Sequence, residues 1–150
     1  MNGTEEEVWD FVETARKEFR TLPVEEIASP RGCNNLAQYS DATNIYSKGT
    51  PIHVRGALLY NHLLKKKNVH KRYENVKNSD KIHFTYLTVP NPINENVISF
   101  INVLPREFEL QNYVDYDMQF DKSFIEPLKN IITLIGWNVE PVASLDSFFG

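Results

Sequence analysis

Apolar residues recur at helical spacing near both ends of this 150-residue chain. Near the N-terminus, Thr4 and Glu7 form a capping box, and the residues after it predict a helix over about 5–20. Its apolar stripe consists of Val8, Phe11, Val12, Ala15 and Phe19. A second such stripe predicts a helix over residues 124–135, which Gly136 is placed to end. The stripe consists of Phe124, Ile125, Leu128, Ile131, Ile132 and Ile135.

The middle of the chain predicts one more long helix and a small sheet. Residues 53–66 carry an apolar helical face, whereas residues 82–89 and 97–103 read as strands of an antiparallel pair. We therefore expect an α+β fold. It should be a mostly helical domain over residues 1–141, with a β tip at 82–103 and an extended tail at 142–150. Between the helices, "SPRG" reads as a break, "NNLAQYS" as a short helix and residues 40–52 as a loop.

Charge is unevenly distributed along the sequence. The net charge is −4, yet residues 48–81 hold nine lysines and arginines against only Glu74 and Asp80. Such a block in an acidic chain indicates a local footprint for a polyanion. A solvated surface segment that keeps the protein soluble would give the same pattern.

Several function classes lack residues to support them. A single cysteine, Cys33, forms no internal disulfide and makes no zinc site, which favours a reducing compartment. No phosphate-binding loop or histidine ligand pair occurs, and no apolar run is long enough to span a membrane. Asp115 and Asp117 are expected to be ordinary carboxylates of a helix start. We therefore expect a binding module without catalytic residues, metal ligands or a cofactor.

Several motifs resemble one protein family in order and rough spacing. They are "NNLAQYS", "PIHVRGALLYN", "YLTVPNPINENVISF", "QFDKSFIEPL" and "ASLDSFFG". They are similar to the C-terminal region of the family B replicative DNA polymerases of T-even-type bacteriophages. The resemblance implies a thumb domain that grips primer–template duplex DNA as it leaves the active site. It also implies a C-terminal peptide that binds the sliding clamp.

The same resemblance implies what must lie elsewhere. The family's palm motifs, DxxSLYPS and YGDTDS, and its exonuclease carboxylates are absent from this sequence. Magnesium is therefore expected only in the missing palm, and this chain should be inactive alone. Its partners would be the remaining polymerase domains or a partner subunit, in the cytoplasm of an infected bacterium. The chain would be either a fragment or a separately encoded subunit.

Groups suited to a duplex grip cluster in the basic segment, residues 34–81. A polymerase holds any sequence, so its contacts should go to phosphates, sugars and the minor groove. His53 begins a helix, where backbone N–H groups favour anions, and Gly56 suits close approach of a strand. Arg55 would serve equally as a structural ion-pair partner, and Tyr39 as a packing residue. The expected DNA-binding residues are Asn34, Asn35, Tyr39, Ser40, Lys48, His53, Arg55, Gly56, Lys65, Lys66 and Lys67.

The last residues form a candidate docking peptide. Leu145, Phe148 and Phe149 are spaced to share one helical face, which suits insertion into a groove. The expected clamp-binding set is Leu145, Asp146, Phe148, Phe149 and Gly150. A tail packed on its own domain is the alternative. A free-standing interaction protein that docks only through this tail is the competing function, and a small enzyme has no residue constellation behind it.

Overall fold

The computed structural model describes residues 4–140, and the chain divides into two compact units. Unit 1 combines Met1–Leu22 with Tyr116–Gly150, and unit 2 is Pro23–Asp115. The expected single domain over residues 1–141 did not include this division. Helices and a small antiparallel sheet make up the described chain, so the α+β fold class is confirmed.

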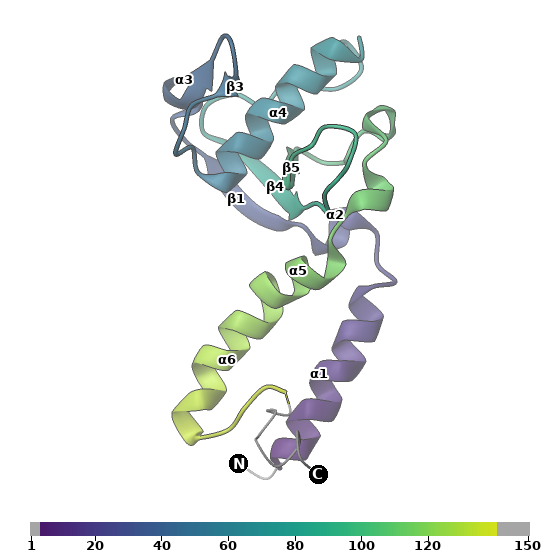
Figure 1. The fold of residues 1–150 in the computed structure, drawn as a ribbon, viewed down its shortest axis with the longest axis vertical. Coiled ribbons are helices and arrows are strands. Elements are labelled where there is room, and N and C mark those ends of the chain that lie inside the picture. The colour runs from purple at the N-terminus through teal and green to yellow at the C-terminus, as the bar shows by residue number, and fades with distance from the viewer. Residues whose placement is uncertain (1–3, 141–150) are drawn as a thin grey trace. The chain divides into compact units, whose positions relative to one another are not determined.

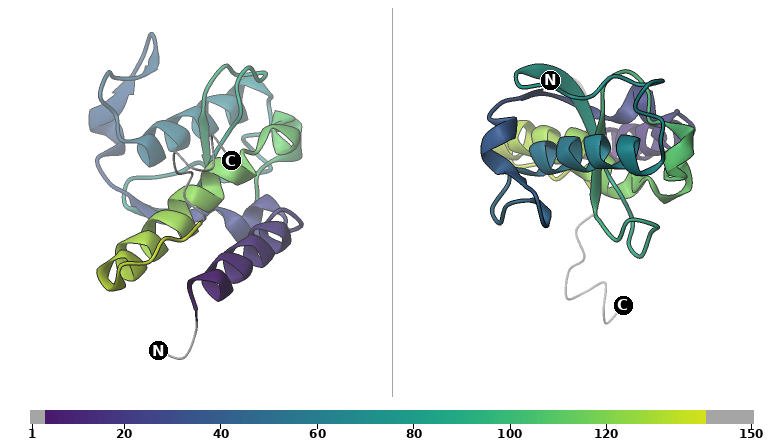
Figure 2. Two further views of the ribbon diagram at one scale, coloured as in Figure 1. Left: turned by 60° about the horizontal axis from the view of Figure 1, so that its bottom comes forward. Right: turned by 90° about the horizontal axis from the view of Figure 1, so that it is seen from above.

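Unit 1 is built from two helical segments. The helix α1 (Glu5–Phe19) begins as expected, because Thr4 Oγ1 accepts a hydrogen bond from the Glu7 N–H at 3.2 Å. The second segment runs through α5 (Tyr116–Phe120), the π-helix η3 (Asp121–Ile125), α6 (Glu126–Ile132) and the 3₁₀ turn η4 (Thr133–Ile135). Gly136 caps it with φ of +82°. Figures 1 and 2 show the two segments side by side.

The core of unit 1 lies along the line where these segments meet. It contains Val12, Phe120, Ile125, Ile132 and Val139. Phe11 and Ile131 were expected on the buried faces, but their side chains are 62% and 65% exposed. Two helices cover only one strip of each other, so residues off that strip stay in solvent. The π-helix also changes the helical period within the second segment.

Unit 2 is a three-stranded sheet packed against one helix. Its order is β1 (Ser29–Cys33), β4 (Asp80–Tyr86) and β5 (Val97–Phe100), with both neighbouring pairs antiparallel. The predicted pair of strands is confirmed, with His83 opposite Phe100. The reading of "SPRG" as a break is wrong, since these residues lie in β1. Pro30 is tolerated there because β1 is an edge strand and a proline on an edge need not donate to a ladder.

The helix α4 (Ile52–Lys66) packs against β5 and provides a large share of the unit's buried apolar side chains. Fully buried side chains meet at this contact, among them Ala57, Leu64, Ile98 and Phe100. Figure 1 shows α4 running across β4 and β5. The β4–β5 segment, expected as a tip, therefore lies in the interior of unit 2.

Short elements complete unit 2. They are α2 (Val24–Ile27), α3 (Leu36–Tyr39), β2 (Ser40–Asp41), β3 (Ile45–Tyr46), η1 (Arg106–Phe108) and η2 (Gln111–Tyr113). The expected short helix is α3, whereas the segment expected as a loop contains the antiparallel β2–β3 pair. Within residues 4–140, no helix is long and apolar enough to cross a membrane.

Candidate nucleic-acid interface

One end of α4 gathers most of the predicted DNA-binding residues. The elements α3, β3 and β1 all contact α4, and Figure 1 shows them around its N-terminal end. His53 lies in the first turn of α4, and exposed Lys48 lies in the preceding loop. Tyr39 is in α3, with Asn34, Asn35 and Ser40 directly beside it. We call Asn34, Asn35, Tyr39, Ser40, Lys48 and His53 the α4 N-terminal cluster.

The side chains of the two asparagines before α3 do not cap it. Asn35 occupies the N-cap position with φ of 62°, but its side chain makes no capping hydrogen bond. Instead, the Leu36 N–H donates to Asn78 Oδ1 at 3.2 Å. The exposed Asn34 and Asn35 side chains are therefore not used to cap α3, whereas Ser40 Oγ donates to the Ala37 carbonyl at 3.1 Å.

His53 is held against the edge strand β1. Burial lowers the pKa of His53 from its ordinary value, the positive charge of Arg31 lowers it further, and a hydrogen bond with the Gly32 backbone acts in the opposite direction. The Arg31 guanidinium lies over the Phe84 ring, 5.3 Å from its centroid, and donates to the Pro30 carbonyl at 2.8 Å. Arg31 is exposed and beside the cluster, yet the sequence prediction missed it because "SPRG" read as a break. Recognising that β1 pairs with β4 would have placed Arg31 beside His53.

Arg55 joins three segments of unit 2. It donates to Asn96 Oδ1 at 2.8 Å and lies over the Tyr46 ring at 5.6 Å. The Tyr46 hydroxyl in turn donates to Glu95 Oε1 at 2.8 Å. Burial raises the pKa of Tyr46, and the hydrogen bond to Glu95 adds to the shift.

This network bears on the expected role of Arg55. The guanidinium of Arg55 is half-buried and largely used within the protein, which favours its structural reading. Among residues 4–140, its Nε is one of two buried side-chain nitrogen or oxygen atoms without a hydrogen-bond partner. Glu95 and Asn96 hold Tyr46 and Arg55 in place.

Gly56 is buried, and its missing side chain has a packing reason. A Cβ built on Gly56 would lie 2.4 Å from Ser99 Oγ and 2.8 Å from the Ser99 backbone nitrogen. Both distances are far below van der Waals contact, so α4 approaches β5 this closely only because residue 56 is glycine. The close approach is to the protein's own strand.

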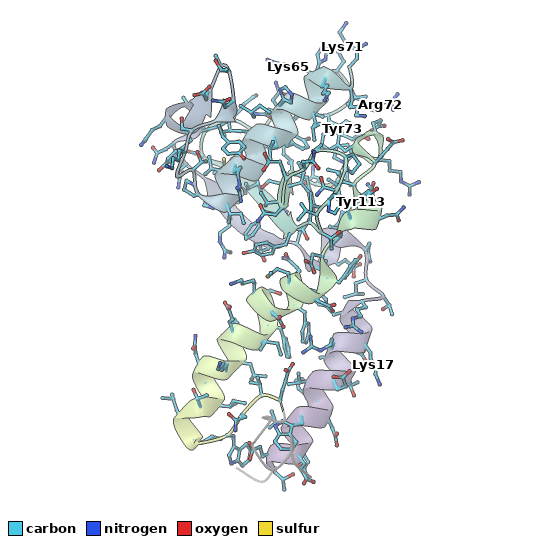
Figure 3. All side chains as sticks on the ribbon, in the orientation of Figure 1. Lys17, Lys65, Lys71, Arg72, Tyr73 and Tyr113 are labelled. Carbon is cyan, nitrogen blue, oxygen red and sulfur yellow. The ribbon has the colours of Figure 1, made fainter. Side chains whose placement is uncertain are left out.

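The three lysines of the predicted set lie at the other end of α4. Lys65 is twelve positions after His53, which is about 18 Å along a helix. Figure 3 shows Lys65 there with Lys71 and Arg72. Lys65, Lys66 and Lys67 are exposed. The structure therefore places these lysines and the α4 N-terminal cluster at opposite ends of one helix.

Arg72, from the same basic block, is held by an ion pair. Its Nη1 lies 2.8 Å from Glu107 Oε1, and the Tyr73 hydroxyl donates to the same oxygen at 3.2 Å. The hydrogen bond from Tyr73 and the contact with Arg72 lower the pKa of Glu107. Arg72 thus fixes the loop after α4 to η1.

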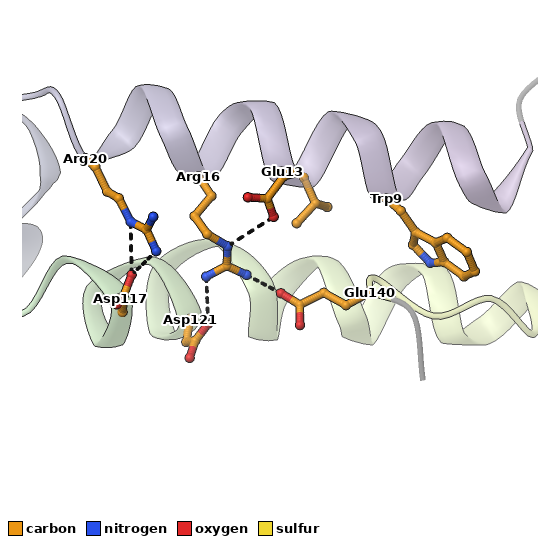
Figure 4. A pocket seen from close by; sticks show the side chains of 8 residues that line it. Trp9, Glu13, Arg16, Arg20, Asp117, Asp121 and Glu140 are labelled. Carbon is orange, nitrogen blue, oxygen red and sulfur yellow. Dashed lines mark hydrogen bonds and ion pairs between the residues drawn. The ribbon is translucent and has the colours of Figure 1, made fainter. Parts of the chain in front are cut away.

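Unit 1 contains a pocket of about 630 Å³ that is lined by charged side chains (Figure 4). Arg16 is at its centre and pairs with Glu13, Asp121 and Glu140, while Arg20 pairs with Asp117 at 2.7 Å. The Trp9 Nε1–H donates to the Asn138 carbonyl at 2.9 Å. These contacts tie the segment after Gly136 to α1, so the pocket has a structural explanation.

Two further groups of residues bear on metal binding and docking. Within residues 4–140, no group of three or more histidine, cysteine, aspartate or glutamate side chains could hold a metal ion. The Asp115 N–H donates to the Tyr86 carbonyl at 2.9 Å, and Asp117 belongs to the ion pair with Arg20. The predicted clamp-binding residues Leu145, Asp146, Phe148, Phe149 and Gly150 lie outside the described residues.

Comparison with known proteins supports the family resemblance. No family model matches the chain. It is 29% identical to the DNA-directed DNA polymerase of Enterobacteria phage T4 in an alignment of 150 residues, which covers 97% of this chain and 16% of that protein. It is also 29% identical to the DNA-directed DNA polymerase of Escherichia phage RB69 over 136 residues, or 87% of this chain and 14% of that protein. The resemblance to phage DNA polymerases is confirmed. The chain spans about a sixth of the length of these curated relatives, so it is similar to one part of a phage DNA polymerase.

Proposed function

We propose that this chain is the thumb part of a phage replicative DNA polymerase and grips the primer–template duplex. The observation that carries the proposal is the α4 N-terminal cluster, together with Arg31 beside it, in a chain similar to phage DNA polymerases. Polymer synthesis itself would depend on palm carboxylates and magnesium supplied outside this sequence.

The chemistry of the cluster suits the duplex backbone. Lys48 and Arg31 supply exposed positive charge, and the asparagines supply neutral donors for phosphate oxygens. The first turn of the fifteen-residue helix α4 adds backbone N–H groups and the positive end of its dipole. None of these groups needs a base edge, which fits an enzyme that must hold any sequence.

The lysines at the far end of α4 extend the same surface chemistry. Their distance of about 18 Å from His53 corresponds to roughly five base pairs of duplex. We propose that Lys65, Lys66 and Lys67 contribute non-directional attraction, while the α4 N-terminal cluster provides the positioned contacts.

Salt-dependent binding to labelled duplex DNA tests this proposal. Fluorescence anisotropy with two unrelated 24-base-pair duplexes should give similar affinities that fall steeply as salt rises. The double variant Arg31→Ala/Lys48→Ala should weaken binding to both and reduce the slope of log K against log salt by about 2. The matched control Lys17→Ala/Lys129→Ala removes two exposed charges from unit 1 and should leave the slope unchanged. Binding that ignores salt, or equal losses in both double variants, contradicts the proposal.

The C-terminal peptide would attach the chain to the sliding clamp. Such a tether raises the effective concentration of the polymerase at the primer end without a new DNA contact. Deleting Leu145–Gly150 should abolish binding to the phage clamp and leave duplex affinity unchanged. Retained clamp binding after the deletion would argue against this role.

A further inference from the structure

Unit 1 exposes an apolar face that spans its two helical segments. Phe11 of α1 is 62% exposed, and Ile131, Leu134 and Ile135 of the second segment are 65%, 85% and 52% exposed. We call these four residues the open face. The Phe11 ring lies 6.2 Å from the Phe124 ring, so apolar surface continues from one segment to the other. Scattered single apolar residues need no explanation, whereas a continuous group of this size indicates a contact surface.

The chain's own return segment covers a different side of the helices. Residues 136–140 run past Trp9, Arg16 and Glu5, where Asn138 and Glu140 make their hydrogen bonds and ion pair. Trp9 and Phe11 are two positions apart, which is about 200° around an α-helix. Phe11 therefore lies on the opposite side of α1 from this segment, and Ile131 and Leu134 of the second segment are exposed as well.

Charge indicates the kind of surface that fits the open face. The described residues of unit 1 include ten aspartates and glutamates but five lysines and arginines. Glu7 and Glu18 are at i−4 and i+7 from Phe11, so they border the open face on the same stripe of α1. An acidic border repels DNA, and it would also oppose the same border of a second copy. A protein surface with an apolar centre and lysines or arginines at its rim is complementary.

We propose that the open face docks this chain onto the catalytic domains of the polymerase. This inference rests on the proposed function, since the relatives are about six times longer than this chain. It assigns separate tasks to the two units. Unit 2 presents its basic helix ends to DNA, while unit 1 presents an acidic-rimmed apolar surface to protein.

The test uses this chain and a purified polypeptide that comprises the catalytic domains of the same polymerase. The double variant Ile131→Glu/Leu134→Glu places charge at two exposed positions and should keep the fold, as checked by circular dichroism. Association measured by calorimetry should weaken at least tenfold, and primer extension by the mixture should fall in parallel. The matched control Val89→Glu/Val103→Glu changes two exposed valines of unit 2, which are 60% and 47% exposed, and should associate normally.

The acidic border of the open face, Glu7 and Glu18, is tested separately by charge reversal. The variant Glu7→Lys/Glu18→Lys should weaken association several-fold, with the difference from wild type shrinking at high salt. Duplex affinity of each variant without the partner reports on the proposed function independently. If the wild-type chain did not bind duplex DNA in a salt-dependent manner, the proposed DNA grip itself would be refuted.

Four results would overturn the docking proposal. The first is normal association by Ile131→Glu/Leu134→Glu, and the second is an equal loss in the Val89→Glu/Val103→Glu control. The third is a wild-type chain that binds duplex DNA but does not associate with the catalytic polypeptide. The fourth is a wild-type dimer, measured by analytical ultracentrifugation, that the open-face variant dissociates, because it would assign the face to a second copy.

Discussion

Replacing Gly56 by alanine should disturb the packing of α4 against β5, because the added Cβ would meet Ser99 and Ile98. The added Cβ would lie 2.4 Å from Ser99 Oγ, 2.8 Å from Ser99 N and 3.1 Å from the Ile98 carbonyl carbon. The serine hydroxyl can rotate only by giving up its 2.9 Å hydrogen bond to the His53 carbonyl. The other two atoms belong to the β5 backbone and can move only if the strand shifts.

The expected size of the effect follows from two opposing contributions. Alanine favours a helix interior over glycine by about 1 kcal/mol. Overpacking a well-packed core costs about 1–3 kcal/mol, and more where backbone must move. Because two of the three close atoms are backbone, we expect the clash to prevail and Gly56→Ala to lower the free energy of unfolding by about 1–2 kcal/mol. A chain of 150 residues that unfolds in one transition should then melt about 2–4 °C lower for each kcal/mol.

Urea and thermal unfolding followed by circular dichroism measure this effect. Combining Gly56→Ala with Ser99→Ala removes the nearest atom but leaves the 2.8 Å approach to Ser99 N, so the double variant should recover only part of the loss. A Gly56→Ala variant as stable as the wild type would refute the packing reason for this glycine. Unchanged stability with a large loss of duplex affinity would instead assign Gly56 to DNA contact.

Three further predictions concern individual side chains. Cys33 is fully buried, and burial raises its pKa to about 11; a thiol reagent at pH 8 should therefore label the chain only in denaturant, and rapid native labelling would contradict this burial. His53 has a lowered pKa in the folded state relative to 6.5, so the unfolded chain binds its proton first and stability should fall as pH drops through about 6.5 toward the lower folded value. Urea midpoints measured between pH 7.5 and 5 should decline less for His53→Gln than for the wild type. Parallel declines of the two proteins would count against the burial of the His53 ring. Arg72→Ala should lower duplex affinity less than Lys48→Ala, because Arg72 already pairs with Glu107. It should cost under about 1 kcal/mol of stability, because the Arg72 side chain is 69% exposed. Anisotropy showing the reverse order of affinities would contradict the structural role of Arg72.

The candidate site was only partly readable from the sequence. The loop-to-helix group around His53 was recognised because polar residues, a helix start and a family pattern coincide within a short stretch. Arg31 was missed because its position depends on β1 pairing with β4, a partner about fifty residues away. The sequence could not show that Arg55 would bind Asn96, or that Arg72 would bind Glu107, because each partner comes from another part of the chain.

Local features of this protein were determined by its sequence alone. Apolar spacing located α1 and α4, Thr4 marked the start of the first helix, and Gly136 marked the end of the last. Each of these signals acts within one or two helical turns, so neighbouring residues suffice to specify it. Only the tertiary structure decided which side of each helix is covered. Phe11 and Ile131 have the same apolar character as buried Val12 and Ile132. Burial depends on what packs against a side chain, and the packing partners are distant in sequence.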